Sequence, residues 1–195
     1  GRAAAVALNA HPAWLVAGVA QLSAYILLTA LRWQLVLRGL GGELPLATSL
    51  RLAWIAAFFS QVLPASVGGD AVRMWLYWQR SGSQRLAIHG VLLERLVLIV
   101  MLLLMVLAIQ PGLAARGAPL TIVITAAVVL AAIILGLLAL VFTRRLLAAA
   151  WLPLRVLASV AGDMRGLFSD LPRTALLCLL SLAAHANTVL AAWLI

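Results

Sequence analysis

Long apolar runs separated by short polar segments dominate the chain. Four of these runs are long enough to cross a membrane and cover about residues 13–31, 87–109, 119–142 and 174–195. About 20 helical residues are needed to span a hydrocarbon core of about 30 Å. The alternation of apolar and polar residues that marks a membrane β-barrel is missing from the sequence. The pattern predicts an all-α fold, a polytopic integral membrane helix bundle.

A fifth apolar stretch, residues 46–63, leads into the sequence LPASVGGDAVRMW at residues 63–75. This sequence combines a proline, two glycines, an aspartate and an arginine where a membrane helix would be ending or crossing. Proline and glycine end helices and mark turns. We therefore expect a turn here, followed by a second helix that runs to about residue 79.

The distribution of arginine favours a hairpin that does not cross the membrane. If residues 46–79 dip in and return, nearly all arginines lie on one side: Arg32, Arg38, Arg80, Arg85, Arg144, Arg145, Arg155, Arg165 and Arg173. A complete crossing would divide them between the two sides, against the positive-inside rule. We predict a re-entrant helical hairpin over 46–79 with both ends cytoplasmic. Such a hairpin implies a cavity or a close packing site, because non-helical backbone is tolerated at membrane depth only there.

Residues 155–171 show helical periodicity between two prolines. Polar residues occupy one face, and the other face holds apolar residues that include Val160, Met164 and Leu167. The pattern predicts a surface amphipathic helix. It would lie on the cytoplasmic membrane surface or pack on its own protein, and the sequence leaves both open.

The composition agrees with a membrane protein, with 66% hydrophobic residues and a mean hydropathy of +1.15. The formal net charge is +9, and all 14 basic residues are arginine. Because these arginines cluster between apolar spans, topology and contact with anionic headgroups explain them, and no nucleic-acid partner is expected in this segment. The chain starts and stops abruptly, so we expect residues 1–195 to be a single membrane domain and a fragment of a longer chain.

Ionisable residues at membrane depth, together with the turn, are the candidates for a functional site. Each such charge costs about 2.5–3.5 kcal/mol in lipid, so it usually pairs or faces water. The candidates for lipid binding or translocation are Arg51, Pro64, Gly68, Gly69, Asp70, Arg73, Glu94 and Arg95.

Asp70 and Arg73 lie where the second helix of the hairpin should begin. We expect Asp70 to be its N-cap. A helix N-terminus inside a membrane protein suits a phosphate or carboxylate, and Arg73 could bind the same anion. The alternative is a buried structural salt bridge between Arg73 and Glu94, and the sequence does not decide between them. Arg73 and Arg51 are the candidate partners of Glu94.

Motifs for catalysis, metal binding or cofactor binding do not accompany these residues. His11, His89 and His185 lack the carboxylate or cysteine spacing of a metal site, and Cys178 is the sole cysteine. We therefore expect no catalytic residue, no metal and no cofactor in this chain.

The order WQLVLRGLGGELPLATSLRLAWIAAFFSQVLPASVGGDAVRMWLYWQRSGSQRLAIHGVLLERLVLI resembles the lysylphosphatidylglycerol synthase transmembrane-region family, also called flippase-like membrane proteins. The matching marks are Arg38 with its glycine-rich link, the segment LPASVGGDAVR, a polar loop and the sequence LLERL. The resemblance covers about residues 32–99. Usual members carry an asparagine shortly before the turn proline, where this chain has Gln61 or Val62.

The resemblance implies a bacterial or archaeal multi-pass protein of the plasma membrane that handles lipids. Our leading hypothesis is a protein that binds or translocates an anionic or polyprenyl-type lipid, with the anionic headgroup as its partner. One alternative is the membrane half of an aminoacyl-phosphatidylglycerol synthase, whose catalytic domain moves lysine or alanine from tRNA to phosphatidylglycerol. Another is a scaffold for lipid-modifying enzymes. Assembly into a homo-oligomer stays open.

Overall fold

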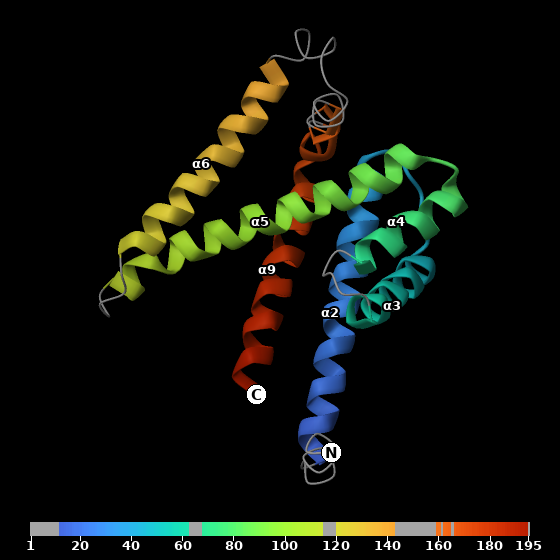
Figure 1. Cartoon of the computed structure of the whole chain (residues 1–195), viewed down its shortest axis with the longest axis horizontal. Coiled ribbons are helices and arrows are strands. Elements are labelled where there is room, and N and C mark those ends of the chain that lie inside the picture. The colour runs from blue at the N-terminus through green and yellow to red at the C-terminus, as the bar shows by residue number, and fades with distance from the viewer. Residues whose placement is uncertain are drawn as a thin grey trace.

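The structure is a computed structural model that describes residues 12–62, 68–114, 120–142, 159–160, 162–164 and 166–194. These residues form helices without a strand, which confirms the predicted all-α membrane bundle (Figure 1). The principal helices are α2 (Pro12–Gly39), α3 (Leu46–Val62), α4 (Gly68–Ser81), α5 (Gln84–Ala114), α6 (Leu120–Phe142) and α9 (Leu171–Leu194).

The long helices follow the predicted spans. Among the described residues, Pro12–Gly39, Gln84–Ile109 and Leu171–Trp193 are long and apolar enough to cross a membrane. The predicted span 119–142 coincides with α6, whose 23 residues carry no charge. The first span was predicted too short, because α2 continues from residue 31 to Gly39. Arg32 and Arg38 therefore lie within α2 and not in an exit loop.

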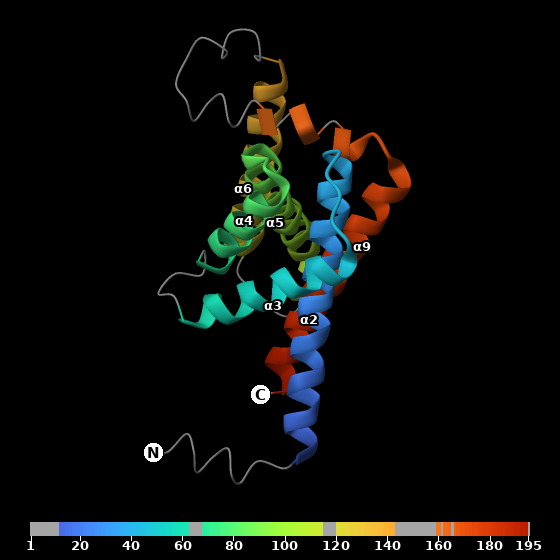
Figure 2. The same cartoon turned by 90° about the vertical axis from the view of Figure 1, so that its right-hand side faces the viewer.

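Helices α3 and α4 form the predicted hairpin. α3 runs across α2 (Figure 2), and α4 then brings the chain back, so that α5 begins at the level where α2 ends (Figure 1). With 14 residues, α4 rises about 21 Å, which is less than the hydrocarbon core of about 30 Å. By length alone, α4 is therefore too short to cross a membrane as a single straight helix. Residues 63–67 at the tip, including Pro64, lie outside the described residues.

The hairpin closes over small residues. The buried positions of α3 are Ser49, Leu52, Ala53 and Ala56, at the spacing of one helical face. A Cβ atom on Gly69 of α4 would lie 2.3 Å from the carbonyl oxygen of Ala56. Real Cβ atoms do not approach backbone this closely. The second glycine of the GGD sequence is thus what allows α4 to lie against α3.

The described part of the predicted surface helix 155–171 packs on the protein. Val160 and Leu167 are buried in one apolar cluster with Val36 of α2 and Leu93 of α5. For these residues the structure favours packing on the chain itself over lying on the membrane surface. Residues 155–158, 161 and 165 of this helix lie outside the described residues.

Asp163 ties the same segment to α5. Its carboxylate accepts hydrogen bonds from Arg85 and from His89, whose Nδ1 lies 2.5 Å from Asp163 Oδ2. The other ring nitrogen of His89 lies 3.2 Å from Ser159 Oγ. Burial would raise the pKa of Asp163, but the hydrogen bonds from Arg85 and His89 outweigh it and hold that pKa below its ordinary value. The carboxylate is therefore charged at neutral pH.

Polar side chains join the long helices to one another. Gln21 Nε2 of α2 donates to the carbonyl oxygen of Asn187 in α9 at 2.7 Å, and Asn187 Nδ2 donates back to the carbonyl oxygen of Gln21 at 3.4 Å. His185 Nε2 lies 3.0 Å from the carbonyl oxygen of Leu98 in α5. Such interhelical bonds satisfy polar groups that lipid cannot. They hold α2, α5 and α9 together as the support on which the hairpin packs.

Replacing Gly69 by alanine should destabilise the hairpin. The added methyl group meets backbone, so α3 and α4 must separate, at a cost of about 1–3 kcal/mol for overpacking. Gly18→Ala is the matched control, because a Cβ there has nothing within 4 Å. Thermal unfolding of the purified protein in detergent should show a lower midpoint for Gly69→Ala only. Equal midpoints for the two variants would show that the contact between α3 and α4 is not close.

Candidate functional site

Charged side chains from three helices form a continuous chain of ion pairs beside the hairpin. We call it the charged network, and its members are Arg32 of α2, Asp70 and Arg73 of α4, and Glu94 and Arg95 of α5. Glu94 Oε1 lies 2.9 Å from Arg32 Nη2, and Glu94 Oε2 lies 2.6 Å from Arg73 Nη2. Arg73 Nη2 is also 3.2 Å from Asp70 Oδ1, and Asp70 Oδ2 is 2.5 Å from Arg95 Nη2. The Glu94 carboxylate of α5 thus links α2 to α4. The Asp70 carboxylate of α4 links that helix to Arg95 of α5.

The network runs from a buried end to an open end. Arg32, Arg73 and Glu94 are 1%, 2% and 2% exposed. The side chain of Asp70 is 12% exposed, and that of Arg95 is 49% exposed. A group that approaches from outside the protein therefore meets Arg95 first, then Asp70.

Helix geometry explains how two adjacent residues of α5 serve opposite ends of the network. Neighbours on a helix point about 100° apart, so Glu94 turns toward α2 while Arg95 reaches the start of α4. On α4, Asp70 and Arg73 are three residues apart and share a face.

Two aromatic rings line the buried end. The guanidinium of Arg73 lies 4.6 Å from the centre of the Trp33 ring. Trp33 in turn meets the Tyr77 ring edge-on, with 5.3 Å between ring centres. A guanidinium over an indole face is held by the ring quadrupole as well as by its carboxylate partners. The position of Arg73 is therefore fixed from two sides.

The charged network carries more positive than negative charge. It contains three guanidinium groups and two carboxylates, which gives it a net charge of +1 although each guanidinium has a carboxylate partner. Among the described residues, four buried N–H groups have no hydrogen-bond acceptor: Arg32 Nε, Arg73 Nε, Arg73 Nη1 and Trp33 Nε1. Each unsatisfied buried donor costs about 1–3 kcal/mol. The site is thus suited to an additional group that brings negative charge and acceptor oxygens.

The chain matches the family described as Lysylphosphatidylglycerol synthase TM region over residues 2–195. It belongs to this family. Searches of curated proteins and of solved structures found no match. Membership supports a multi-pass membrane protein with a role connected to membrane lipids. Trp33 to Ile99, on which the resemblance rests, contains every member of the charged network except Arg32, which directly precedes it.

Two of the predictions made for the site residues of this protein are wrong. Asp70 is not the N-cap of α4, because the helix already includes Gly68; Asp70 lies in the first turn, where a carboxylate favours the helix dipole. Arg51 is not a partner of Glu94. It is exposed on α3 and forms no ion pair with the described residues.

The ion pair between Arg73 and Glu94 is present and buried, as the structural alternative predicted. Arg32 and Trp33 were not predicted as site residues, because Arg32 was expected to lie in a loop after the first span. The apolar pattern that continues on both sides of Arg32, in TALRWQLVL, was the available signal that the helix does not end there. Gly69 allows α4 to pack against α3, and both Gly68 and Gly69 directly precede Asp70 of the network in the chain.

Replacing Glu94 by glutamine should be strongly destabilising. The change leaves two buried guanidinium groups without their shared counter-charge, and breaking a buried ion pair costs about 3–5 kcal/mol. Glu43→Gln is the matched control, because Glu43 is exposed and forms no ion pair with the described residues. Thermal unfolding and gel filtration in detergent measure the effect. Glu94→Gln with the same unfolding midpoint as Glu43→Gln would contradict this account.

Proposed function

We propose that this protein binds or translocates an anionic membrane lipid whose headgroup engages the charged network. The observation that carries the proposal is the surplus positive charge beside buried N–H groups without acceptors. A phosphate group supplies both missing elements, because its oxygens accept charge-assisted hydrogen bonds from guanidinium groups. The same chemistry suits a phospholipid and a polyprenyl phosphate.

In this proposal the lipid headgroup first binds at the open end of the charged network. Asp70 is shared between the outer Arg95 and the inner Arg73. A phosphate that binds Arg95 displaces the Asp70 carboxylate from that guanidinium, and Asp70 then keeps Arg73 as its partner. Exchange of partners at Asp70 would let the headgroup move inward without leaving a guanidinium unpaired.

An apolar cavity next to this end supports the proposal. Its volume is about 330 Å³, and it lies between α4 and α5, lined by Ala71, Met74, Trp75, Trp78, Gln84, Ala87 and Ile88. Ala71 directly follows Asp70 in the chain, so the cavity begins where the headgroup would bind. An acyl or prenyl chain fits a cavity of this chemistry.

The membrane half of an aminoacyl-phosphatidylglycerol synthase is a second candidate, and the family description favours it. In that case the charged network handles a lipid that a separate catalytic domain has modified. Purified protein with lysyl-tRNA and phosphatidylglycerol would then form no lysyl lipid by itself, yet would still bind the lipid. The bacterial or archaeal plasma membrane as its location is part of the same proposal.

Replacing Arg95 by glutamine tests lipid translocation. Arg73 is unsuitable, because its removal would leave Glu94 partly uncompensated in the interior. A lost charge-assisted hydrogen bond is worth about 1.5–3 kcal/mol, so the rate should fall about tenfold or more. The assay follows fluorescent phosphatidylglycerol across the bilayer of proteoliposomes. Arg95→Lys should recover part of the rate, since it keeps the charge but loses the fork of donors.

Arg80→Gln is the control for this experiment. It removes the same charge from an exposed residue at the end of α4 that forms no ion pair with the described residues. Thermal unfolding of each variant ensures that folded proteins are compared. Folded Arg95→Gln that moves lipid as fast as Arg80→Gln would overturn the proposal and favour a scaffold.

A further inference from the structure

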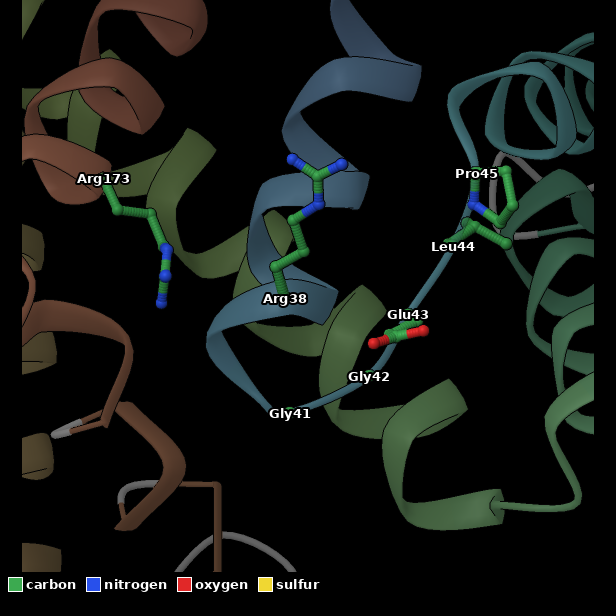
Figure 3. A pocket seen from close by; sticks show the side chains of 7 residues that line it. All are labelled: Arg38, Gly41, Gly42, Glu43, Leu44, Pro45 and Arg173. Carbon is green, nitrogen blue, oxygen red and sulfur yellow. The ribbon is translucent and has the colours of Figure 1, made fainter.

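A second cavity lies where α2 ends, and unlike the first it is lined by charged side chains. Its volume is about 520 Å³, and Figure 3 shows the residues that line it: Arg38, Gly41, Gly42, Glu43, Leu44, Pro45 and Arg173. Arg38 comes from the last turn of α2, and Arg173 comes from the first turn of α9. The charged network does not share a residue with this cavity.

Backbone hydrogen bonds hold the floor of the cavity. Gly41 adopts a positive φ of 79°, and the amide of Gly42 donates to the carbonyl oxygen of Leu37 at 2.8 Å. This turn caps α2 in the manner that favours glycine. Gln34 Nε2 then donates to the carbonyl oxygen of Leu44 at 2.6 Å, which anchors the chain before α3 begins. The loop between α2 and α3 thus has a conformation that hydrogen bonds define.

The charges around the cavity are arranged for an anion. Arg38 is exposed and forms no ion pair with the described residues. Arg173 pairs with Asp170 at 3.1 Å, yet its side chain is still 31% exposed. Arg38 stands between Arg173 and Glu43 in Figure 3. Arg38 thus offers its guanidinium to an anion in the cavity, and Arg173 offers the part of its side chain that Asp170 leaves exposed.

Helix dipoles explain only one of the two arginines. Arg38 favours the dipole at the C-terminal end of α2, so it has a purely structural explanation. Arg173 lies near the N-terminal end of α9, where a positive charge is unfavourable. Asp170 offsets that cost, and an anion in the cavity would offset it further. Arg173 is therefore the residue that points to a ligand.

We infer that this cavity binds a phosphate ester between Arg38 and Arg173. It lies where α2 ends, close to the start of α5 (Figure 1), on the side predicted to be cytoplasmic, where lipid headgroups would lie. Six residues separate Arg38 from Arg32, about 9 Å along the helix, and they face different directions at about 100° per residue. The cavity is therefore a site distinct from the charged network. Glu43 opposes the anion and limits how much negative charge the site accepts.

This inference is tested by measuring the binding of a lipid, and not its translocation. Native mass spectrometry of the full chain in detergent measures the affinity for short-chain phosphatidylglycerol. Arg38→Gln and Arg173→Gln should each weaken binding about tenfold, the effect of one charge-assisted hydrogen bond. Glu43→Gln should strengthen binding a few-fold, a gain that misfolding cannot produce. Arg80→Gln again serves as the control and should leave the affinity unchanged.

A competition experiment identifies the source of the phosphate. If glycerol 1-phosphate displaces the lipid at similar concentration, the natural ligand is a soluble phosphate ester. If it does not, the ligand is a lipid headgroup. Both results support the cavity as a phosphate site. The proposed phosphate site would be overturned if Arg38→Gln, Arg173→Gln and Glu43→Gln all kept the wild-type affinity. This holds even if Arg95→Gln blocks translocation.

Discussion

The buried carboxylate of Glu94 is the interaction on which the rest of the structure depends. It sits between the guanidinium groups of Arg32 and Arg73 and so joins the first long helix to the hairpin. Removing these three charges from water costs several kcal/mol for each ion, and only close geometry recovers it. The packing around them must therefore be tight. The Trp33 ring against Arg73 and the interhelical bonds among α2, α5 and α9 supply that constraint.

The hairpin follows from the same constraint. Arg73 reaches Glu94 only if α4 comes back toward α5, and α4 lies against α3 only because Gly69 carries no side chain where Ala56 approaches. A longer α4 that crossed the membrane would place its first turn on the opposite side from the start of α5. The short helix, the glycine and the buried ion pair are thus one solution to a single problem, which is to keep a charged helix inside an apolar bundle.

Hydrophobic pattern and turn chemistry were enough to predict the helices and the hairpin, because length and apolarity decide them directly. The partners of the charges were not predictable to the same degree. Arg32 was assigned to a loop because the positive-inside rule treats arginine as a marker of membrane exit. Asp70 was assigned as an N-cap because the start of a helix is uncertain by a residue or two in any sequence. Arg73 and Arg51 were the partners that the sequence suggested for Glu94; the structure confirms Arg73, and the packing of α2 against α5 adds Arg32, which was not predicted.

The arginines of α2 lie at two levels along the helix, and in the proposed function these two levels give the path of the headgroup a direction. Arg38 lies beside an open cavity at the end of α2, whereas Arg32 lies about 9 Å away along the helix and is buried in the network. A phosphate in hydrocarbon would meet a large desolvation cost, which falls if fixed donors replace its hydration. Guanidinium groups at two depths would lower the desolvation cost of the phosphate in two stages. In the proposed function, Asp70 and Glu94 already occupy part of the inner level, so a headgroup that arrives there exchanges partners with these carboxylates, as its later release requires.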